Sequence, residues 1–369
     1  MSEPLQTTNF KTEFYKNIFP DAEFCENNEV KVFTGFDEEY YSLTKGVAVR
    51  DLSASSILNL KGESTPDFIN RISTNEVAKL EDGKTIRTLF TNEKGRIIDR
   101  TTLINLGAGE FLLVGSPAYR EKLHSWIQNY IYLESIEKTD VSDEYLLLEI
   151  SGPQANSYLT IICGNLVDKV DNNSLVSCNT DGFIFDLFKL KNIRQQEKYW
   201  LMINYERAED FIKFMIDKKL VFDLSFVGPD AYNSFRAELG IPAAPNEINT
   251  HYNPHEIGLI EEVSFNKGCY IGQEVIARLD TYDKIQKFLC GLVFEQAPDE
   301  LPAETLSIVD SSANDAGKLT TVANSKKLKK VIGLGIIKKN YVNNESDLFV
   351  KISDEIKIPV KITKLPFEK

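Results

Sequence analysis

The segment from Lys267 to Glu274 combines a thiol, two glycines and several polar side chains within a few residues. A strand-like stretch ends near Asn266 and a helical pattern begins near Gly272, so we expect Cys269 in a strand-to-helix turn. The free N–H groups and the dipole at a helix N-terminus favour a thiolate, and Lys267 adds a nearby cation. The segment therefore predicts a reactive or redox-sensing cysteine.

The residues around Cys269 could also shape a ligand site. Gly268 and Gly272 allow the backbone angles that a tight turn around a ligand requires. Gln273 and Glu274 offer hydrogen-bond acceptors to a ring that bears N–H groups. The alternative is that Cys269 is a small buried residue and that the glycines only form a turn. The residues predict a site here without identifying its ligand.

The bulk composition is that of a globular protein with several domains. The chain has 369 residues, of which 42% are hydrophobic and 26% charged, and this length is typical of two or three domains. Asp and Glu total 55 against 42 Lys and Arg, which gives a net charge of −13. This balance argues against general nucleic-acid binding and against binding to anionic membranes. A local basic pocket for a small anion remains compatible with it.

The cysteines indicate reduced thiols and a cytoplasmic location, because they are odd in number and form no CxxC pair. The N-terminus carries no apolar signal core, and no stretch approaches the ~20 apolar residues of a membrane helix. With three histidines in the chain, a histidine-rich metal centre is not expected. The five cysteines are Cys25, Cys163, Cys178, Cys269 and Cys290.

The elements that would position the Lys267–Glu274 segment form runs of strands and helices, which indicates an α+β fold. One unit begins near residue 57 with an apolar strand, and Thr65-Pro66 then opens a helix. A related unit begins with a strand at Leu146–Ile150, so we expect two similar subdomains. The first unit continues with strands near 85–91, 96–106 and 110–115 and a helix opened by Ser116-Pro117. The second continues with a helix opened by Gly152-Pro153, strands at 183–190 and 199–204, and a helix around Phe211–Met215.

The two ends of the chain differ from this pattern. Residues 1–45 are expected to be irregular or partly helical, and a helix at Pro229–Leu239 should end at Gly240. After Lys287, short apolar runs separated by polar turns predict a small all-β domain. Within it, the Ser-, Asn- and Lys-rich residues 310–330 are expected to form an exposed loop with weak strand content. The predicted strands are Phe288–Phe294, Val331–Ile337, Leu348–Ile352 and Ile356–Ile362.

Lys267–Glu274 resembles the signature of the YgfZ-type folate-binding proteins, Lys-Gly-Cys-Tyr/Phe-x-Gly-Gln-Glu, at every defined position. Upstream, Arg236–Pro242 resembles the Arg-x-Glu-x-Gly-Ile-Pro element of that family. Asn253–Leu259 similarly resembles its Pro-x-Glu-x-Gly-Leu element. Weaker similarity, shared with the related glycine-cleavage T-protein, an aminomethyltransferase, occurs at Val47–Leu52, Thr74–Val77 and Thr91–Asp99.

This resemblance implies a three-lobed ring of two related α+β subdomains and a C-terminal antiparallel β-barrel. Residues 1–284 would form the folate-binding domain, with an inserted subdomain at about 55–140, and residues 285–369 would form the barrel. Tetrahydrofolate or a one-carbon derivative would lie in the central channel, with Arg236 or Arg278 near its glutamate tail. The residues implied to shape the site are Lys267, Gly268, Tyr270, Gly272, Gln273 and Glu274.

One position departs from the T-protein pattern. That enzyme ends its Gly-Gly-Ile-x-Asp-Asp strand with a catalytic aspartate, where this chain has Arg100. An arginine would repel the cationic, iminium-like carbon that a carboxylate stabilises during transfer. Asp99 is adjacent, but a shift of one residue on a strand points its side chain to the opposite face. The Gly-Tyr-Thr-Gly-Glu loop of the enzyme also has no counterpart between 183 and 204.

The resemblance to YgfZ implies a folate-dependent accessory protein that supports iron–sulfur cluster assembly or repair in other proteins. Cys269 would be its reactive residue, and client or assembly proteins would be its partners. One thiol cannot supply the usual four ligands of a cluster, so the chain is not expected to hold one. A folate-dependent one-carbon transferase and a binding module with a purely structural folate remain alternatives.

Overall fold

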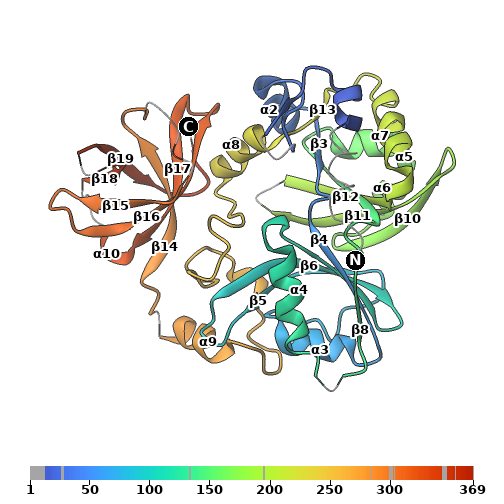
Figure 1. The fold of residues 1–369 in the computed structure, drawn as a ribbon, viewed down its shortest axis with the longest axis horizontal. Coiled ribbons are helices and arrows are strands. Elements are labelled where there is room, and N and C mark those ends of the chain that lie inside the picture. Colours follow the sequence, from blue (N-terminus) through green and yellow to red (C-terminus); the bar gives the residue numbers. More distant parts are fainter. Residues whose placement is uncertain are drawn as a thin grey trace.

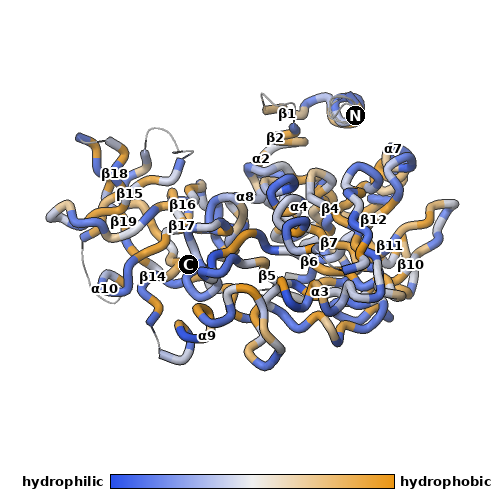
Figure 2. Tube along the Cα trace, turned by 60° about the horizontal axis from the view of Figure 1, so that its bottom comes forward, coloured by the Kyte–Doolittle hydropathy of each residue, from blue (hydrophilic) through white to orange (hydrophobic). Residues whose placement is uncertain are grey.

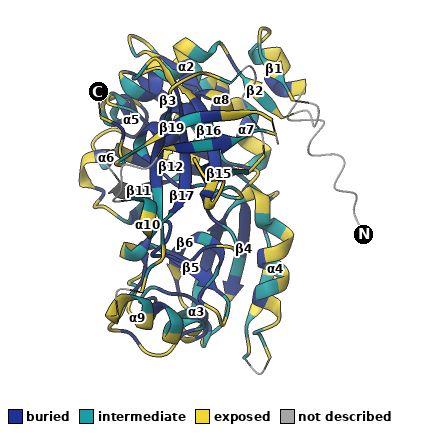
Figure 3. Ribbon diagram, turned by 90° about the vertical axis from the view of Figure 1, so that its left-hand side faces the viewer, coloured by how far each residue is buried: buried dark blue, intermediate teal, exposed yellow. Residues whose placement is uncertain are grey.

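The computed structural model describes residues 13–25, 29–132, 134–193, 196–282, 284–298, 302, 304–342, 347–353 and 355–368. In these ranges the chain forms two mixed α/β lobes and a closed β-barrel (Figure 1). The expected α+β fold with a C-terminal antiparallel barrel is confirmed. Hydrophobic segments follow the strands of the sheets and barrel, and the same strands are the most buried elements (Figures 2 and 3).

The first lobe is built on a five-stranded antiparallel sheet with the order β5-β6-β7-β4-β8. Its helix α3 starts with Pro66 in the first turn and buries Phe68, Ile69 and Ile72 against the sheet. The predicted hairpin strands and both predicted helices are present. The elements are β4 (Ser56–Lys61), α3 (Thr65–Ile72), β5 (Thr85–Thr91), β6 (Ile97–Gly107), β7 (Glu110–Gly115), η1 (Pro117–Tyr119), α4 (Arg120–Gln128) and β8 (Glu137–Asp140).

The second lobe contains a six-stranded sheet with the order β10-β11-β12-β9-β3-β13, in which β13 pairs parallel to β3. Tyr158 and Phe211 are fully buried between its helices and the sheet. The predicted strands and helices are present, with β10, β3 and β13 in addition. The elements are α2 (Phe36–Thr44), β3 (Val47–Asp51), β9 (Tyr145–Ser151), α5 (Ala155–Cys163), α6 (Leu166–Lys169), β10 (Ser174–Thr180), β11 (Phe183–Ile193), β12 (Gln196–Asn204), η2 (Tyr205–Arg207), α7 (Ala208–Asp217) and β13 (Leu224–Phe226).

The C-terminal barrel closes in the order β14-β17-β16-β15-β18-β19. The expectation of an exposed loop over 310–330 is wrong, because most of this stretch is strand β16. Its apolar residues Ala316, Leu319 and Ala323 are buried, and so are the hydroxyl residues Thr320, Thr321 and Ser325, whereas Asp315, Lys318 and Asn324 are exposed. The elements are β14 (Lys287–Phe294), β15 (Leu306–Asp310), β16 (Asp315–Ser325), β17 (Lys330–Lys338), α10 (Lys339–Val342), β18 (Leu348–Lys351) and β19 (Lys357–Thr363).

Helix α8 (Pro229–Leu239) and the segment after it connect the lobes to the barrel. The helix ends as predicted at Gly240, whose left-handed φ of +66° suits glycine. On the barrel side, Ser234 donates to the backbone oxygen of Asn324 over 2.6 Å. The expected lead-in contains β1 (Glu23–Phe24), β2 (Val30–Val32) and α2, and its residues 1–12 lie outside the described residues. Two short helices follow α8, η3 (Ile260–Glu262) and α9 (Gln273–Thr281).

Candidate ligand-binding site

A cavity of about 600 Å³ lies between the two sheets, helix α8 and the 241–248 segment. Its volume falls in the range of about 300–1,000 Å³ that is typical of small-molecule sites. Basic side chains converge on it from strands of both sheets and from α8, in a chain whose net charge is −13. We call it the central cavity. Its charged lining residues are Arg50, Arg87, Arg100, Glu149, Lys198, Asp230 and Arg236.

At the second sheet, the lining forms a tight cluster around Glu149. Arg50 Nη1 and Lys198 Nζ approach Glu149 Oε1 at 2.8 and 3.0 Å. Burial alone would raise the pKa of Glu149, but Lys198 and Arg50 lower it to about 2. The Arg50 guanidinium also stacks on Tyr232, 3.2 Å from the ring centroid. Lys198 and Arg50 hold the pKa of this phenol below its usual value, against the effect of burial.

At the first sheet, Arg100 on β6 lines the cavity and pairs with Glu262. Its Nε atom lies 3.0 and 2.9 Å from the two carboxylate oxygens, and Nη2 also donates to Oε1. Asp99 points away from the cavity and accepts from the Ser116 backbone N–H and hydroxyl at 2.9 and 2.6 Å. Burial raises the pKa of Asp99. The expected alternation of these side chains along the strand is therefore present.

Arg87 on β5 lines the same wall, where Glu262 and Glu149 attract it only from beyond ion-pair distance. No ion pair or side-chain hydrogen bond engages its guanidinium anywhere in the described part of the chain. Burial, with the charge of Arg100 beside it, lowers the pKa of Arg87 to about 10. The Arg87 guanidinium therefore remains available to pair with a negatively charged ligand in the central cavity.

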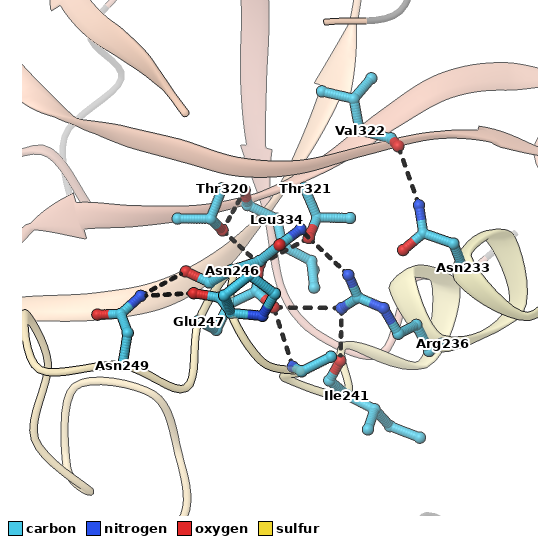
Figure 4. A network of polar contacts seen from close by, with 12 residues as sticks. Asn233, Arg236, Ile241, Asn246, Glu247, Asn249, Thr320, Thr321, Val322 and Leu334 are labelled. Carbon is cyan, nitrogen blue, oxygen red and sulfur yellow. Dashed lines mark hydrogen bonds and ion pairs between the residues drawn. The ribbon is translucent and has the colours of Figure 1, made fainter. Parts of the chain in front are cut away.

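Arg236 reaches the central cavity from α8, but its donors are used within the protein (Figure 4). Nη1 donates to the Ile241 carbonyl at 3.0 Å and to Glu247 Oε2 at 3.2 Å, and Nη2 donates to Thr321 Oγ1 at 2.8 Å. Glu247 is fully buried and also accepts from Thr320 Oγ1 at 2.5 Å. This network joins α8, the following loop and barrel strand β16.

The Lys267–Glu274 segment lies apart from the central cavity, and none of its residues lines it. Lys267 donates through Nζ to the carbonyls of Asn70 at 2.7 Å, Ser73 at 2.9 Å and Asn75. Burial lowers the pKa of Lys267 to about 8. The Lys267 ammonium group therefore hydrogen-bonds to the backbone of the first lobe.

Cys269 is exposed, so the alternative of a small buried cysteine is wrong. The strand expected before it is absent as well, because residues 263–266 form an irregular segment held by Ser264 N–H and the Thr74 carbonyl at 2.9 Å. A helix does follow, starting at Gln273. Cys269 therefore lies in a turn before a helix, as an accessible thiol.

The glycines of the segment differ in their requirements. Gly272 has a φ of +82°, and a Cβ there would lie 2.5 Å from the Asn92 carbonyl oxygen. Gly268 has open space around it and no left-handed backbone angle. Tyr270 is buried, and its hydroxyl has no partner among the described residues. Gln273 is half-buried, whereas Glu274 and Arg278 are exposed.

Of the site residues predicted from the sequence, Arg236 lines the central cavity and the other eight do not, whereas Arg100, noted only as a departure from the T-protein pattern, does. Sequence reasoning missed most of the other charged residues of the cavity, because they lie on strands that come together only in the folded sheets. Charged residues inside apolar strands, such as Arg50 after Val47–Val49, were the available signal. A buried charge in such a run needs a partner or a ligand. The missed lining residues are Arg50, Arg87, Glu149, Lys198 and Tyr232.

Three other findings concern metal binding, membrane spans and a second hollow. In the described ranges, no group of three or more His, Cys, Asp or Glu side chains is placed to hold a metal ion. Nor does any helix there combine the length and the apolar character needed to cross a membrane. A larger hollow of about 1250 Å³ lies beside the barrel, and its lining carries Glu256, Glu295 and Asp347 as well as Lys361 and Lys364, of which Lys361 pairs with Glu295.

Comparison with known proteins gives consistent matches over the chain. The GCVT N-terminal domain matches residues 9–267, and the glycine cleavage T-protein C-terminal barrel domain matches 287–369. A chloroplastic transferase-like protein of Arabidopsis thaliana is 28% identical over 85% of this chain and 70% of its own length. The aminomethyltransferase of Flavobacterium psychrophilum is 26% identical over 94% of both chains. The glycine cleavage system aminomethyltransferase T of Bartonella henselae superposes with a TM-score of 0.81 at 16% identity, over 96% of both chains.

Proposed function

Because the chain belongs to the glycine cleavage T-protein family, we propose that its central cavity binds tetrahydrofolate or a one-carbon derivative. A folate joins a flat ring that bears N–H groups to a glutamate with two carboxylates. The proposal rests above all on Arg87, a cation beside Arg100 that has no carboxylate at ion-pair distance among the described residues, in a cavity of about 600 Å³. A cation that is largely withdrawn from water without a direct ion pair is costly, and a bound carboxylate would offset that cost.

We also propose that the bound folate serves an accessory role of the YgfZ type, in iron–sulfur cluster assembly or repair. Arg100 supports this role over aminomethyl transfer, because it stands where a carboxylate would stabilise a cationic transferred carbon, and Glu262 is already paired with it. Asp99 is turned to Ser116 and does not replace the missing carboxylate. Cys269 supplies an accessible thiol that could act on a client protein.

We expect Arg87→Gln to weaken tetrahydrofolate binding by roughly ten- to hundredfold, the value of a charge-assisted hydrogen bond of about 1.5–3 kcal/mol. The unliganded variant should melt no lower than the wild type, because the change removes an unpaired charge. Since the pKa of Arg87 is about 10, wild-type affinity should fall as pH rises through that value. Calorimetric titration and thermal melts check these effects.

Arg207→Gln is the matched control, since Arg207 is exposed and outside the cavity. It should bind tetrahydrofolate as the wild type does. Unchanged affinity in Arg87→Gln would contradict the assigned role of Arg87. No measurable binding of any folate to the wild type would remove the proposal itself.

The accessory role is tested in a strain that lacks the gene. We expect Cys269→Ala to leave the activity of iron–sulfur enzymes at the level of the deletion strain, because the accessible thiol is lost. Cys25→Ala is the control, since Cys25 is also exposed but lies outside the signature segment. Full restoration by Cys269→Ala would show that the thiol has no such role.

One-carbon transfer is the second candidate function, and the similarity to two aminomethyltransferases favours it. Mixing the protein with tetrahydrofolate and an aminomethylated lipoyl carrier protein discriminates between the two. Formation of methylene-tetrahydrofolate and ammonia at a catalytic rate would establish the transferase and overturn the accessory role. If folate has only a structural role, it should raise the melting temperature of the protein. The Cys269→Ala variant should then restore iron–sulfur enzyme activity as fully as the wild type does.

A further inference from the structure

A second cavity, of about 660 Å³, adjoins the central cavity on the barrel side of the 245–252 loop. Asn246 lines both cavities, and Ser116-Pro117 and Tyr119 line the two in succession along the same turn. The two spaces therefore border the same loop. We call the second one the lysine chamber. Its basic residues are Lys122, His251, Lys287, Lys318 and Lys338.

The lysine chamber holds few carboxylates close to its lysines, although Asp99 attracts Lys122 from beyond ion-pair distance. Its one acidic lining residue, Asp315, pairs with Lys338 at 2.7 Å. Lys318 donates to Ser307 Oγ at 2.9 Å, and Lys122 Nζ lies 4.4 Å from the Tyr119 ring centroid. Within the described residues, no carboxylate lies at ion-pair distance from Lys122, Lys287 or Lys318. In a chain with a net charge of −13, such a concentration of ammonium groups favours an anionic ligand.

The wall between the cavities is held in place. Asn246 Nδ2 donates to Thr321 Oγ1 at 3.1 Å, which ties the loop to barrel strand β16. Asn249 Nδ2 donates to the carbonyls of Pro245 and Asn246, both at 2.9 Å (Figure 4). A ligand that extends from the central cavity past Asn246 would reach the lysine chamber along a loop that these hydrogen bonds hold in place.

We propose that the lysine chamber receives the γ-linked glutamate extension of a polyglutamyl folate, a site that rests on the proposed folate binding. Each added γ-glutamyl residue contributes one carboxylate on a flexible chain. Separate ammonium groups suit such a ligand, because each acts as a point charge without a fixed bidentate geometry. The lysines are partly open to solvent, so their attraction is screened by salt.

The test compares tetrahydrofolate carrying one glutamate with the form carrying five, titrated calorimetrically into the full chain at low and high salt. Exposed charge pairs contribute little singly, so three of them predict about tenfold tighter binding of the longer form at low salt. The variant Lys122→Gln/Lys287→Gln/Lys318→Gln should bind both forms alike, with wild-type affinity for the short one. Lys338 is left intact because of its pair with Asp315.

The control variant Lys45→Gln/Lys213→Gln/Lys330→Gln removes the same charge from exposed positions outside both cavities, and should keep the preference. Equal affinity of the wild type for the two forms would overturn the proposal, as would a preference that survives in the chamber variant. If tetrahydrofolate with one glutamate binds and the longer form binds no more tightly, the proposed role of the lysine chamber is wrong, but the proposed folate site in the central cavity is not contradicted. Failure of both forms to bind would overturn both proposals.

Discussion

Arg236→Leu should lower the free energy of unfolding by about 3–5 kcal/mol, the usual cost of breaking a buried ion pair from one side. The substitution strands Glu247, which is fully buried and 3.2 Å from the guanidinium. It also removes the donors to Thr321 and to the Ile241 carbonyl. Because these contacts join α8 to the barrel, the loss should appear in urea unfolding and as faster proteolysis between lobe and barrel.

The double variant Arg236→Leu/Glu247→Leu separates the stranded charge from lost packing. Replacing both members of a buried pair by apolar groups is often close to neutral, so the double variant should recover much of the loss. Arg207→Leu, at an exposed arginine, is the surface control. A loss below about 1 kcal/mol in Arg236→Leu would mean that water or the hydroxyls of Thr320 and Thr321 satisfy Glu247 unaided.

Local signals predicted the individual elements well. The helix at Pro229–Leu239 follows from a proline that suits the first turn and a glycine that suits a left-handed end. The alternation of Asp99 and Arg100 follows from the period of two along a strand. Strand β16 was missed because its small residues, such as Ala316 and Ala323, give a weak hydrophobic pattern. Ala316 is buried in the core of the closed barrel, whereas Ala323 packs in a separate cluster with Ala237 of α8.

The candidate site was predicted only in part, because its ionic groups belong to separate strands. Arg50 and Lys198 are far apart in sequence and come together in the fold, at Glu149 and Tyr232. The absence of a partner for Arg87 is likewise a property of the folded lobes. The role of Lys267 was also hidden from the sequence. Its acceptors are backbone carbonyls, which every residue possesses and no residue pattern marks.

Lys267→Met should lower the free energy of unfolding by about 2–4 kcal/mol, because it removes the donor from one buried and two partly buried carbonyl groups. A buried carbonyl without a donor costs about 1–3 kcal/mol unless water replaces that donor. The three acceptors, on Asn70, Ser73 and Asn75, hold the first lobe to the signature segment. Lys79→Met is the control in the same lobe, since the Lys79 side chain is 82% exposed. Urea unfolding at pH 7 gives the comparison, and equal stability of the three proteins would show that water fills the site.

The pH dependence of the unfolding free energy, compared between the wild type and Lys267→Met, tests the protonation state of the Lys267 amine. Burial lowers the pKa of Lys267 from 10.5 to about 8 in the folded chain. Between these values the unfolded chain holds more protons than the folded one, so this group makes wild-type stability rise with pH across that window. The Met variant lacks the group and should lack this contribution, so the deficit of the variant should widen as pH rises from 8 toward 10.5. A deficit that stays constant would mean that the three carbonyls keep the ammonium charged throughout.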